Sequence, residues 1–291
     1  MQPAPPSLSA RCGAEVLGTF ILVLFGCGSV HVAVLTGDLG LGQVAMVWGI
    51  AIMLAAYCVG GISGAHINPA MTLALAAWGR FAWRDVPGYI GAQLAGTILA
   101  AAALYGLFHP MLDEKENIRS VSRGQPGSEI TAMCYGEYYP NPGKFAGGAG
   151  RYDPHEHAFH YTLVTQPMAF LAEFLGTAIL ALMVFALTDA RNPAAPQARL
   201  APVFIGLTVA ILISVIAPLT QACFNPARDF GPRLVAYFTG WGDIAIPGPN
   251  GSGFFTVYIL APIAGAVAGG GLYTSVLRPC LPVAVEESKT T

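Results

Sequence analysis

The sequence predicts an all-α membrane protein with six transmembrane helices and two re-entrant half-helices, arranged as two inverted repeats of three and a half spans each. Three observations predict this fold. Of the 291 residues, 54% are hydrophobic and only 10% are charged, whereas a soluble domain carries about 25% charged residues. Six apolar runs can each cross a hydrocarbon core, which needs about 20 residues. Two copies of one tripeptide lie between such runs, Asn68-Pro69-Ala70 and Asn225-Pro226-Ala227.

The six predicted spans carry almost no charge. Glu15 and Glu173 are the charged residues within them, and an ionised group in hydrocarbon is costly unless it is paired or hydrogen-bonded. We expect each glutamate to give structural support by accepting N–H groups of a re-entrant loop, and a proton-relay role is the alternative. The spans cover residues 13–35, 44–62, 86–108, 167–188, 201–219 and 254–277.

The charges beside the spans predict that both termini are cytoplasmic and that the chain is a multi-pass protein of the cell membrane. Basic residues of short cytoplasmic segments fix such an orientation. Residues 1–10 have no charged start, so no cleavable signal peptide is expected. A net charge of −2 gives no indication of a nucleic-acid partner. The flanking basic residues are Arg11, Arg80, Arg84, Arg191, Arg199, Arg278 and Lys289.

Each of the two tripeptides predicts a helix that begins abruptly inside the membrane. Asn is a favoured N-cap, and Pro is tolerated in the first turn of a helix. The helix predicted over 68–78 is about 16 Å long at 1.5 Å per residue, about half of a 30 Å hydrocarbon core; 225–237 is similar. The loops before them, 61–67 and 220–224, should therefore line a water-filled path. A third Asn-Pro-Ala, at 192–194, lies in a polar segment and predicts a cytoplasmic turn.

An internal duplication connects the two halves of the chain. Glu173 follows Glu15 by 158 residues (173 − 15), and Asn225 follows Asn68 by 157 (225 − 68). Because each copy crosses the membrane an odd number of times, the second is inverted. We expect one channel domain over 1–291, with repeat one at about 11–109, a long outer loop at about 110–166, repeat two at about 167–278 and a short disordered tail.

Two motifs of the sequence resemble those of a known protein family. The stretch from Ser63 to Ala70, and Asn225-Pro226-Ala227-Arg228, resemble the two defining motifs of the major intrinsic proteins, the aquaporins. Asp229, Arg233 and Pro262-Ile263 resemble the aquaglyceroporin branch, which includes the bacterial glycerol facilitators. The resemblance implies an aquaporin-like fold, a homotetramer with one pore per subunit in a lipid bilayer, and passive passage of small neutral solutes such as glycerol and water.

The resemblance also implies a narrowest ring of four residues, a selectivity filter formed by Trp48, Ile213, Ala222 and Arg228. A typical glycerol facilitator has Gly in place of Ile213 and an aromatic residue in place of Ala222, and water-selective members have His at the Ile213 position. The combination found here instead resembles the nodulin-26-like channels of plants.

The remaining candidate residues surround this ring. Asn68 and Asn225 can donate to a passing solute, and Arg228 can exclude cations together with the half-helix dipoles. Asp229 and Arg233 have the i, i+4 spacing of a stabilising pair. We expect the pore-loop backbone to be formed by Gly64, Ala65, His66, Cys223 and Phe224.

The chain is therefore interpreted as a passive channel, not an enzyme, that requires no cofactor or metal. One alternative is a channel mainly for water, ammonia or neutral metalloid acids. A second alternative, from a different class, is a proton-coupled secondary transporter, since inverted repeats and broken helices also occur there. The outer loop contains His155, His157 and His160, for which metal binding and pH sensing are minor alternatives to solvated surface histidines. The six cysteines do not predict a disulfide framework.

Overall fold

The computed structural model describes residues 5–145 and 152–282. In this part of the chain the regular structure is helical, without β-strands. Six segments are long and apolar enough to cross a membrane, which confirms the predicted fold class. They are Leu8–Leu35, Leu41–Ser63, Trp83–Arg119, Gln166–Leu187, Ala198–Thr220 and Gly253–Cys280.

The labelled helices follow this order along the chain, and short 3-10 and π turns extend several of them. The spans are built on α1 (Leu8–Leu35), α2 (Leu41–Ser63), α4 (Val86–Arg119), α8 (Gln166–Leu187), α9 (Ala201–Thr220) and α12 (Ala261–Leu272). The shorter helices are α3 (Pro69–Ala77), α5 (Glu129–Ala132), α6 (Pro142–Phe145), α7 (Pro154–His160), α10 (Pro226–Ala236) and α11 (Gly253–Phe255).

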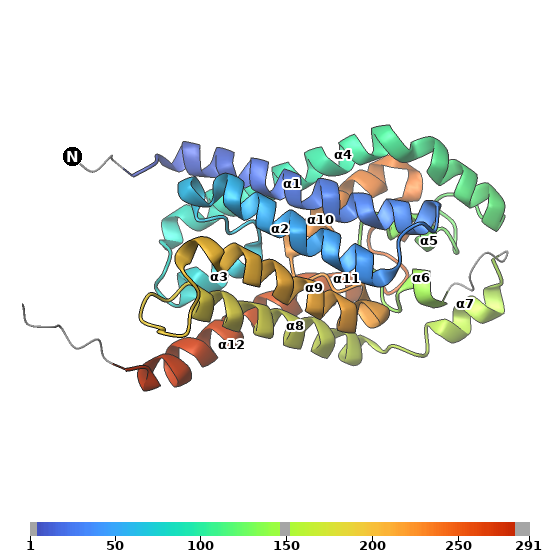
Figure 1. The fold of residues 1–291 in the computed structure, drawn as a ribbon. Coiled ribbons are helices and arrows are strands. Elements are labelled where there is room, and N and C mark those ends of the chain that lie inside the picture. Colours follow the sequence, from blue (N-terminus) through green and yellow to red (C-terminus); the bar gives the residue numbers. More distant parts are fainter. Residues whose placement is uncertain (1–4, 146–151, 283–291) are drawn as a thin grey trace, which may run out of the picture.

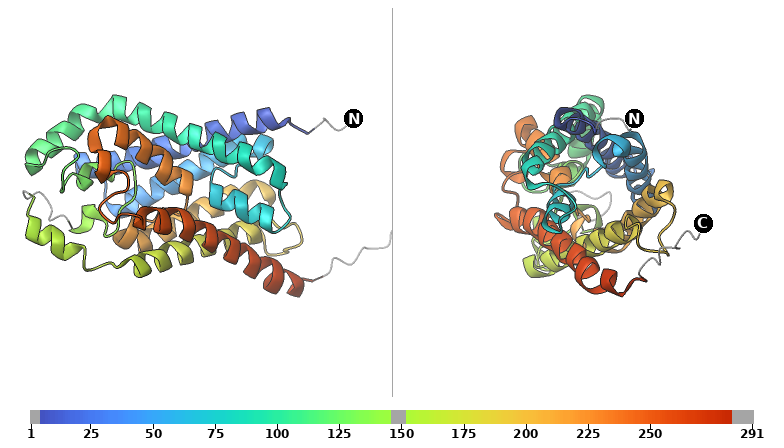
Figure 2. Two further views of the ribbon diagram at one scale, coloured as in Figure 1. Left: turned by 180° about the vertical axis from the view of Figure 1, so that it is seen from behind. Right: turned by 90° about the vertical axis from the view of Figure 1, so that its left-hand side faces the viewer.

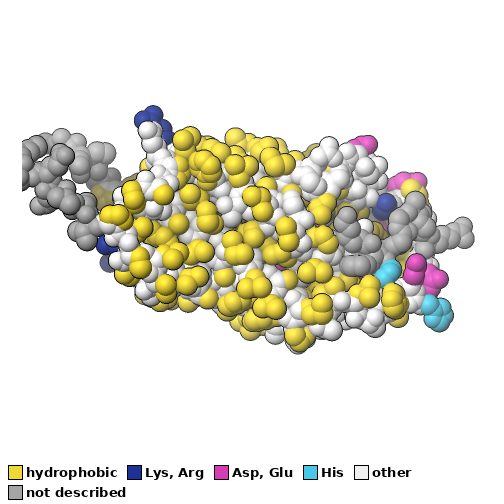
Figure 3. All heavy atoms as spheres, turned by 60° about the horizontal axis from the view of Figure 1, so that its bottom comes forward, with side chains coloured by type: hydrophobic (Ala, Val, Ile, Leu, Met, Phe, Trp, Pro, Cys, Tyr) yellow, Lys and Arg dark blue, Asp and Glu magenta, His cyan; other side chains and the backbone are white. Residues whose placement is uncertain are grey.

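The helices run side by side as an elongated bundle, and both ends of the chain lie at the same end of it (Figure 1). Viewed along the bundle, the spans form a ring (Figure 2, right). In Figure 3 hydrophobic side chains cover the middle of the face shown, while charged side chains and His lie near the two ends: Lys and Arg at one end, and Asp, Glu, His and a further Lys or Arg at the other. This distribution is that of a molecule whose middle faces lipid and whose two ends face water.

Glycines let the principal helix pairs approach closely. Helix α1 packs against α4, α8 against α12 and α2 against α9. A Cβ on Gly96 would lie 2.2 Å from the Thr19 hydroxyl, and one on Gly49 would lie 2.6 Å from the Gly206 carbonyl oxygen. On Gly269 it would lie 2.0 Å from a backbone oxygen of α8. Membrane helices commonly associate through such small residues, because lipid gives no hydrophobic drive for burial.

The helix of the third span continues beyond the predicted span into the predicted outer loop. The prediction ended this span at residue 108, but α4 continues to Arg119. Residues 111–119 are mostly good helix formers, and Leu112 and Glu116 are buried there. Glu116 accepts the hydroxyl of Thr131, in the outer segment that follows α4, at 2.6 Å. The segment that follows is compact: every residue from 127 to 142 is buried. It includes α5 and part of α6, at the end opposite the termini (Figure 1).

The two re-entrant loops are shorter than predicted. Helix α2 continues through Gly60 and Gly61 to Ser63, and α9 continues to Thr220. The non-helical stretches are therefore 64–67 and 221–224. Each α helix ends on a residue in the left-handed region, Gly64 at φ 84° and Gln221 at φ 65°, which is a common way to end a helix.

Arg11, Arg80, Arg84, Arg191, Arg199 and Arg278, which were predicted to be cytoplasmic, gather at the end that holds both termini, whereas Lys115, Arg119 and Arg123 lie at the other end of α4. Asp85 pairs with Arg11 at 3.0 Å, and Asp189 pairs with Arg278 at 2.8 Å and with Arg80 at 3.7 Å. The segment 192–194 forms the predicted turn nearby, where the Asn192 side chain accepts the N–H of Ala194 at 3.1 Å. All six cysteines are free thiols. Lys289 and the predicted disordered tail lie outside the described residues.

Candidate pore

The two half-helices begin face to face in the middle of the bundle. The Asn68 amide oxygen accepts the Ala70 N–H at 2.8 Å, and the Asn225 amide oxygen accepts the Ala227 N–H at 3.1 Å, so each caps its own helix. The two Nδ2 groups then cross over. Asn68 donates to the carbonyl of Phe224 at 2.8 Å, and Asn225 donates to the carbonyl of Ile67 at 2.8 Å.

This reciprocal contact fixes where the two helix N-termini meet. Pro69 and Pro226 occupy the first helical position, where no backbone N–H is required. An amide side chain has two N–H donors, so each asparagine retains one beyond the crossed hydrogen bond. The partly positive helix ends and these donors face the same region.

Glu15 holds the first re-entrant loop. It is fully buried in α1 and accepts the backbone N–H groups of His66 at 2.9 Å and Ile67 at 2.7 Å. The hydroxyl of Ser63 and the amide of Gln93 also donate to it, at 2.7 and 2.8 Å.

Glu173 holds the second loop in the same way. It is fully buried in α8 and accepts the N–H groups of Cys223 at 3.0 Å and Phe224 at 2.9 Å, and the Thr220 hydroxyl at 2.6 Å. The loops need such support because Ala65, Ile67, Ala222 and Phe224 all have positive φ, which is unfavourable for residues with a side chain.

Two cavities follow the axis of the bundle on either side of the predicted ring. The inner cavity, on the side of the termini, has a volume of about 430 Å³; the outer cavity, on the side of α5, has about 320 Å³. Trp48, Ile213 and Arg228 line both cavities, and Ala222 lines the inner one. The inner cavity is also lined by the pore-loop residues of the prediction, Gly64, Ala65, His66, Cys223 and Phe224, and by Asn68 and Asn225.

A glycine positions the largest ring residue. Trp48 lies on α2, and a Cβ on Gly26 of α1 would be 2.3 Å from its indole ring. Only a residue without a side chain allows the indole to lie there. The guanidinium carbon of Arg228 is 4.7 Å from the centre of the same ring, within the range of a cation–π interaction. Gly26 could not be singled out from the sequence, because the spans contain many glycines.

Arg228 also contacts the outer loop, which the sequence did not predict. Its Nη1 donates to the carbonyl of Tyr135 at 2.7 Å, and its Nη2 forms an ion pair with the carboxylate of Glu137. Arg228 and Glu137 are 3% and 2% exposed, so this pair is almost fully desolvated. Burial raises the pKa of Glu137 above the usual range of a carboxyl group, while the positive charge of Arg228 opposes this increase. The only sequence feature that could have indicated this contact is that Glu137 is the one acidic residue in the aromatic stretch 131–140.

Asp229 and Arg233 form a second buried pair beside the first. The Arg233 guanidinium donates to the two Asp229 oxygens at 2.8 and 3.0 Å. The same two side chains hold the backbone of Glu137: its N–H donates to Asp229 at 2.6 Å, and its carbonyl accepts from Arg233. The i, i+4 pair predicted from spacing thus also anchors the outer loop on α10.

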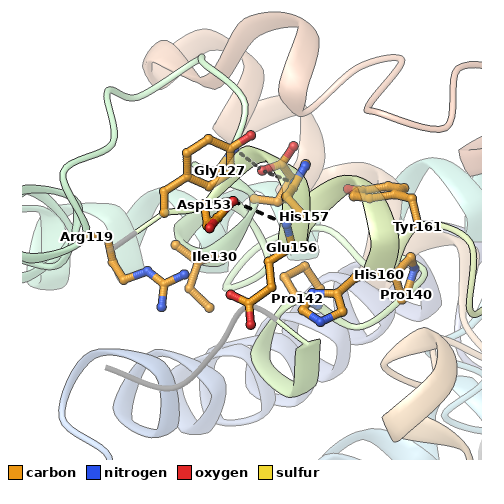
Figure 4. Close-up of a pocket in the computed structure, with 12 residues that line it drawn as sticks. Arg119, Gly127, Ile130, Pro140, Pro142, Asp153, Glu156, His157, His160 and Tyr161 are labelled. Carbon is orange, nitrogen blue, oxygen red and sulfur yellow. Dashed lines mark hydrogen bonds and ion pairs between the residues drawn. The ribbon is translucent and has the colours of Figure 1, made fainter. Parts of the chain in front are cut away.

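The histidines of the outer loop lie on or at the end of α7, away from these cavities. His157 and His160 line a small cavity of about 30 Å³ together with Glu129 and Glu156 (Figure 4). The His157 Nε2 is 3.4 Å from the carboxylate of Glu129. Among the described residues, no cluster of three or more His, Cys, Asp or Glu side chains is arranged to hold a metal ion.

Comparison with known proteins agrees with the resemblance. The glycerol uptake facilitator protein of Pseudomonas aeruginosa is 39% identical over 280 residues, which cover 96% of this chain and 92% of that protein. The propanediol uptake facilitator of Citrobacter freundii is 38% identical over 277 residues, 95% of each chain. The X-ray structure of the aquaglyceroporin from Plasmodium falciparum has the same fold, with a TM-score of 0.75 at 22% identity over 94% of this chain and 98% of that one.

The family model of the major intrinsic proteins matches residues 5–273, which is almost the whole chain. Together with the paired half-helices and the relatives above, this match confirms the predicted family: the chain belongs to the major intrinsic proteins.

Proposed function

We propose that the chain is a passive membrane channel that conducts glycerol and other small neutral solutes together with water. The observation that carries this proposal is the meeting of two cavities at Trp48, Ile213 and Arg228. The relatives named as glycerol and propanediol uptake facilitators support the same solute class. No bond is made or broken in such passage, and the protein is therefore not proposed to be an enzyme.

In this proposal the four ring residues form the selectivity filter, and they make different kinds of contact with the solute. The Trp48 indole is an apolar wall for the carbon side of a polyol. Arg228 has five N–H donors, of which one is used on Tyr135 and one on Glu137, so three remain for solute oxygens or water. Asn68 and Asn225 offer one further N–H each at the junction of the half-helices. Solute would pass these groups in single file.

The proposed setting is a cell membrane with both termini in the cytoplasm, which is supported by the arginines gathered at that end. We further propose two inverted repeats in one channel domain and assembly as a homotetramer. Chemical cross-linking in membranes would test the tetramer, which requires products up to four subunits and none larger.

A coupled transporter is the less favoured function. Coupling needs an ionisable group that is free to take up and release the driving ion. Glu15 and Glu173 instead accept several hydrogen bonds each from the re-entrant loops, an arrangement that favours a fixed structural role.

Stopped-flow light scattering on proteoliposomes tests the proposed function. Vesicles with the purified protein and vesicles without it are compared for water, glycerol, urea and ammonia. We expect glycerol equilibration to be at least about tenfold faster with the protein, a change of about 1.4 kcal/mol in the barrier. Glycerol entry at the rate of protein-free vesicles would reject the proposal, whatever the result for water.

A further inference from the structure

A carboxylate lies directly beside Arg228 on the outer side of the junction between the two cavities. Glu137 lines the outer cavity, and one of its carboxylate oxygens forms the ion pair with Arg228. Asp229 and Arg233 pair with each other directly beside them. When all four groups are ionised, the two pairs cancel, so this buried cluster has no net charge.

Stability alone is a weak explanation for this carboxylate. The second oxygen of Glu137, Oε2, is buried and has no hydrogen-bond partner in the described part of the chain. A buried ion pair stabilises a protein only when its remaining polar atoms are satisfied, and an apolar replacement is often as stable or more so. Burial of an unpaired carboxylate oxygen has a cost in stability, and the backbone of Glu137 is nevertheless held in place by Asp229 and Arg233. The effect of the Glu137 charge on Arg228 explains this arrangement better.

We propose that Glu137 determines charge selectivity by neutralising Arg228, so that the ring rejects small anions as well as cations. An arginine without a counter-charge in a narrow, poorly hydrated path would attract anions, as basic residues do in anion-selective pores. Cations still meet the positive ends of the two half-helices. This inference rests on the proposed channel function and assigns a further selectivity residue to the same site.

The test substitution is Glu137→Gln, which retains an oxygen for the Arg228 N–H but removes the charge. Because burial raises the pKa of Glu137 while the contact with Arg228 opposes the increase, wild type and variant are compared at about pH 9, where the carboxyl group is ionised. The readout is the ratio of nitrate to glycerol permeability in proteoliposomes, together with the reversal potential under a nitrate gradient. We expect the ratio to rise at least about tenfold, because one uncompensated charge at contact distance is worth more than that in a partly hydrated site.

Two variants control for charge and for disturbance of the loop. Glu137→Asp retains the charge and should keep the nitrate ratio close to that of wild type. Glu129→Gln removes another buried carboxylate of the outer segment, one that faces His157 instead of the ring, and it should leave the ratio unchanged. An equal rise in Glu129→Gln and Glu137→Gln would overturn the proposal, because loosening of the loop would then explain both.

The wild-type protein gives a second test that does not depend on folding of a variant. Glu137 faces Arg228, Asp229 and Arg233 on α10 and is near Glu173 on α8, and Lys115 on α4 lines the same cavity. Lowering the pH stepwise from about 9 to about 5 should protonate Glu137 as the pH falls through its raised pKa, and should raise nitrate permeability in the same way as Glu137→Gln. If wild type conducts glycerol but the ratio of nitrate to glycerol permeability changes neither with pH nor in Glu137→Gln, this inference alone is overturned. If wild type does not conduct glycerol, the proposed channel function is rejected.

Discussion

At the residue scale, Trp48 connects the packing of the bundle to the solute. Its indole ring occupies space that Gly26 leaves open, and it lies against the guanidinium of Arg228. Burial of apolar surface is worth about 25 cal/mol per Å², so loss of about 40 Å² of contact between glycerol carbon and the indole costs about 1 kcal/mol. Water has no carbon to bury. Trp48→Ala should therefore lower the ratio of glycerol to water permeability by about fivefold, measured by stopped-flow light scattering.

A substitution at Ile213, another ring residue, should change the ratio of glycerol to water permeability in the opposite direction. Ile213→Gly should relieve crowding and raise the same ratio, because it removes bulk without removing the indole wall. Both substitutions widen the ring, and widening alone favours glycerol. A ratio that rises in Trp48→Ala would mean that steric exclusion dominates and that the indole is not a binding surface.

The sequence was informative about residues whose role depends on neighbours along the chain. Asn68, Asn225, Asp229 and Arg233 belong to short motifs with local capping and i, i+4 chemistry, and their contacts follow from it. Glu137 reaches Arg228 across 91 positions (228 − 137). No local pattern specifies such a contact, because it depends on how the whole outer loop folds onto α10.

At the element scale, the two glutamates act on the re-entrant loops rather than on the solute. Glu173→Ala would leave the N–H groups of Cys223 and Phe224 without their acceptor, and a buried unsatisfied donor costs about 1–3 kcal/mol. We expect the free energy of unfolding to fall by about 2–5 kcal/mol and both water and glycerol fluxes to be largely lost. Thermal unfolding in detergent and vesicle fluxes measure the two effects. Glu114→Ala, which changes an exposed glutamate of α4, is the control, and equal destabilisation by both would contradict the assigned role.

The contact between α2 and α9 depends on a pair of glycines. A Cβ on Gly49 would lie 2.6 Å from the Gly206 carbonyl oxygen and 3.2 Å from the Cβ of Ala210. Gly49→Ala should therefore push the helices apart and destabilise the protein by about 1–3 kcal/mol. Gly106→Ala is the matched control in α4, because nothing lies within 4 Å of the added carbon there, and better helix propensity should make it neutral or slightly stabilising. Equal melting temperatures for the two variants would show that α2 and α9 tolerate separation.

The ends of the helices could not be predicted from hydrophobic patterns as well as their positions could. Hydrophobic runs located all six spans, but a run ends where polar residues begin, and α4 continues for 11 residues beyond that point, from 108 to 119. Leu112 and Glu116 are buried in this extension, and Glu116 accepts the Thr131 hydroxyl of the outer segment at 2.6 Å, a contact that hydrophobicity does not reveal. Likewise, the first re-entrant loop was predicted to begin at residue 61, whereas α2 continues to Ser63.

At the scale of the whole molecule, the bundle is built from contacts that hold a fixed path. The half-helices are joined by crossed hydrogen bonds at 2.8 Å, and each loop is bound to a fully buried glutamate. A carrier must break such contacts in every cycle to expose its site alternately to the two sides. In the described part of the chain, Glu15 and Glu173 of the spans and Arg228, Asp229 and Arg233 of α10 are already engaged in structural contacts.

Flux through a fixed path should therefore be proportional to the solute gradient and independent of any ion gradient. We expect glycerol entry into proteoliposomes not to saturate over a wide concentration range, and its rate to stay unchanged when a proton or sodium gradient is imposed at equal osmolarity. Protonophore treatment is the control that removes the proton gradient without affecting the solute. Accumulation of glycerol above its external concentration, driven by the imposed pH gradient and abolished by the protonophore, would show coupled transport and would exclude a passive channel.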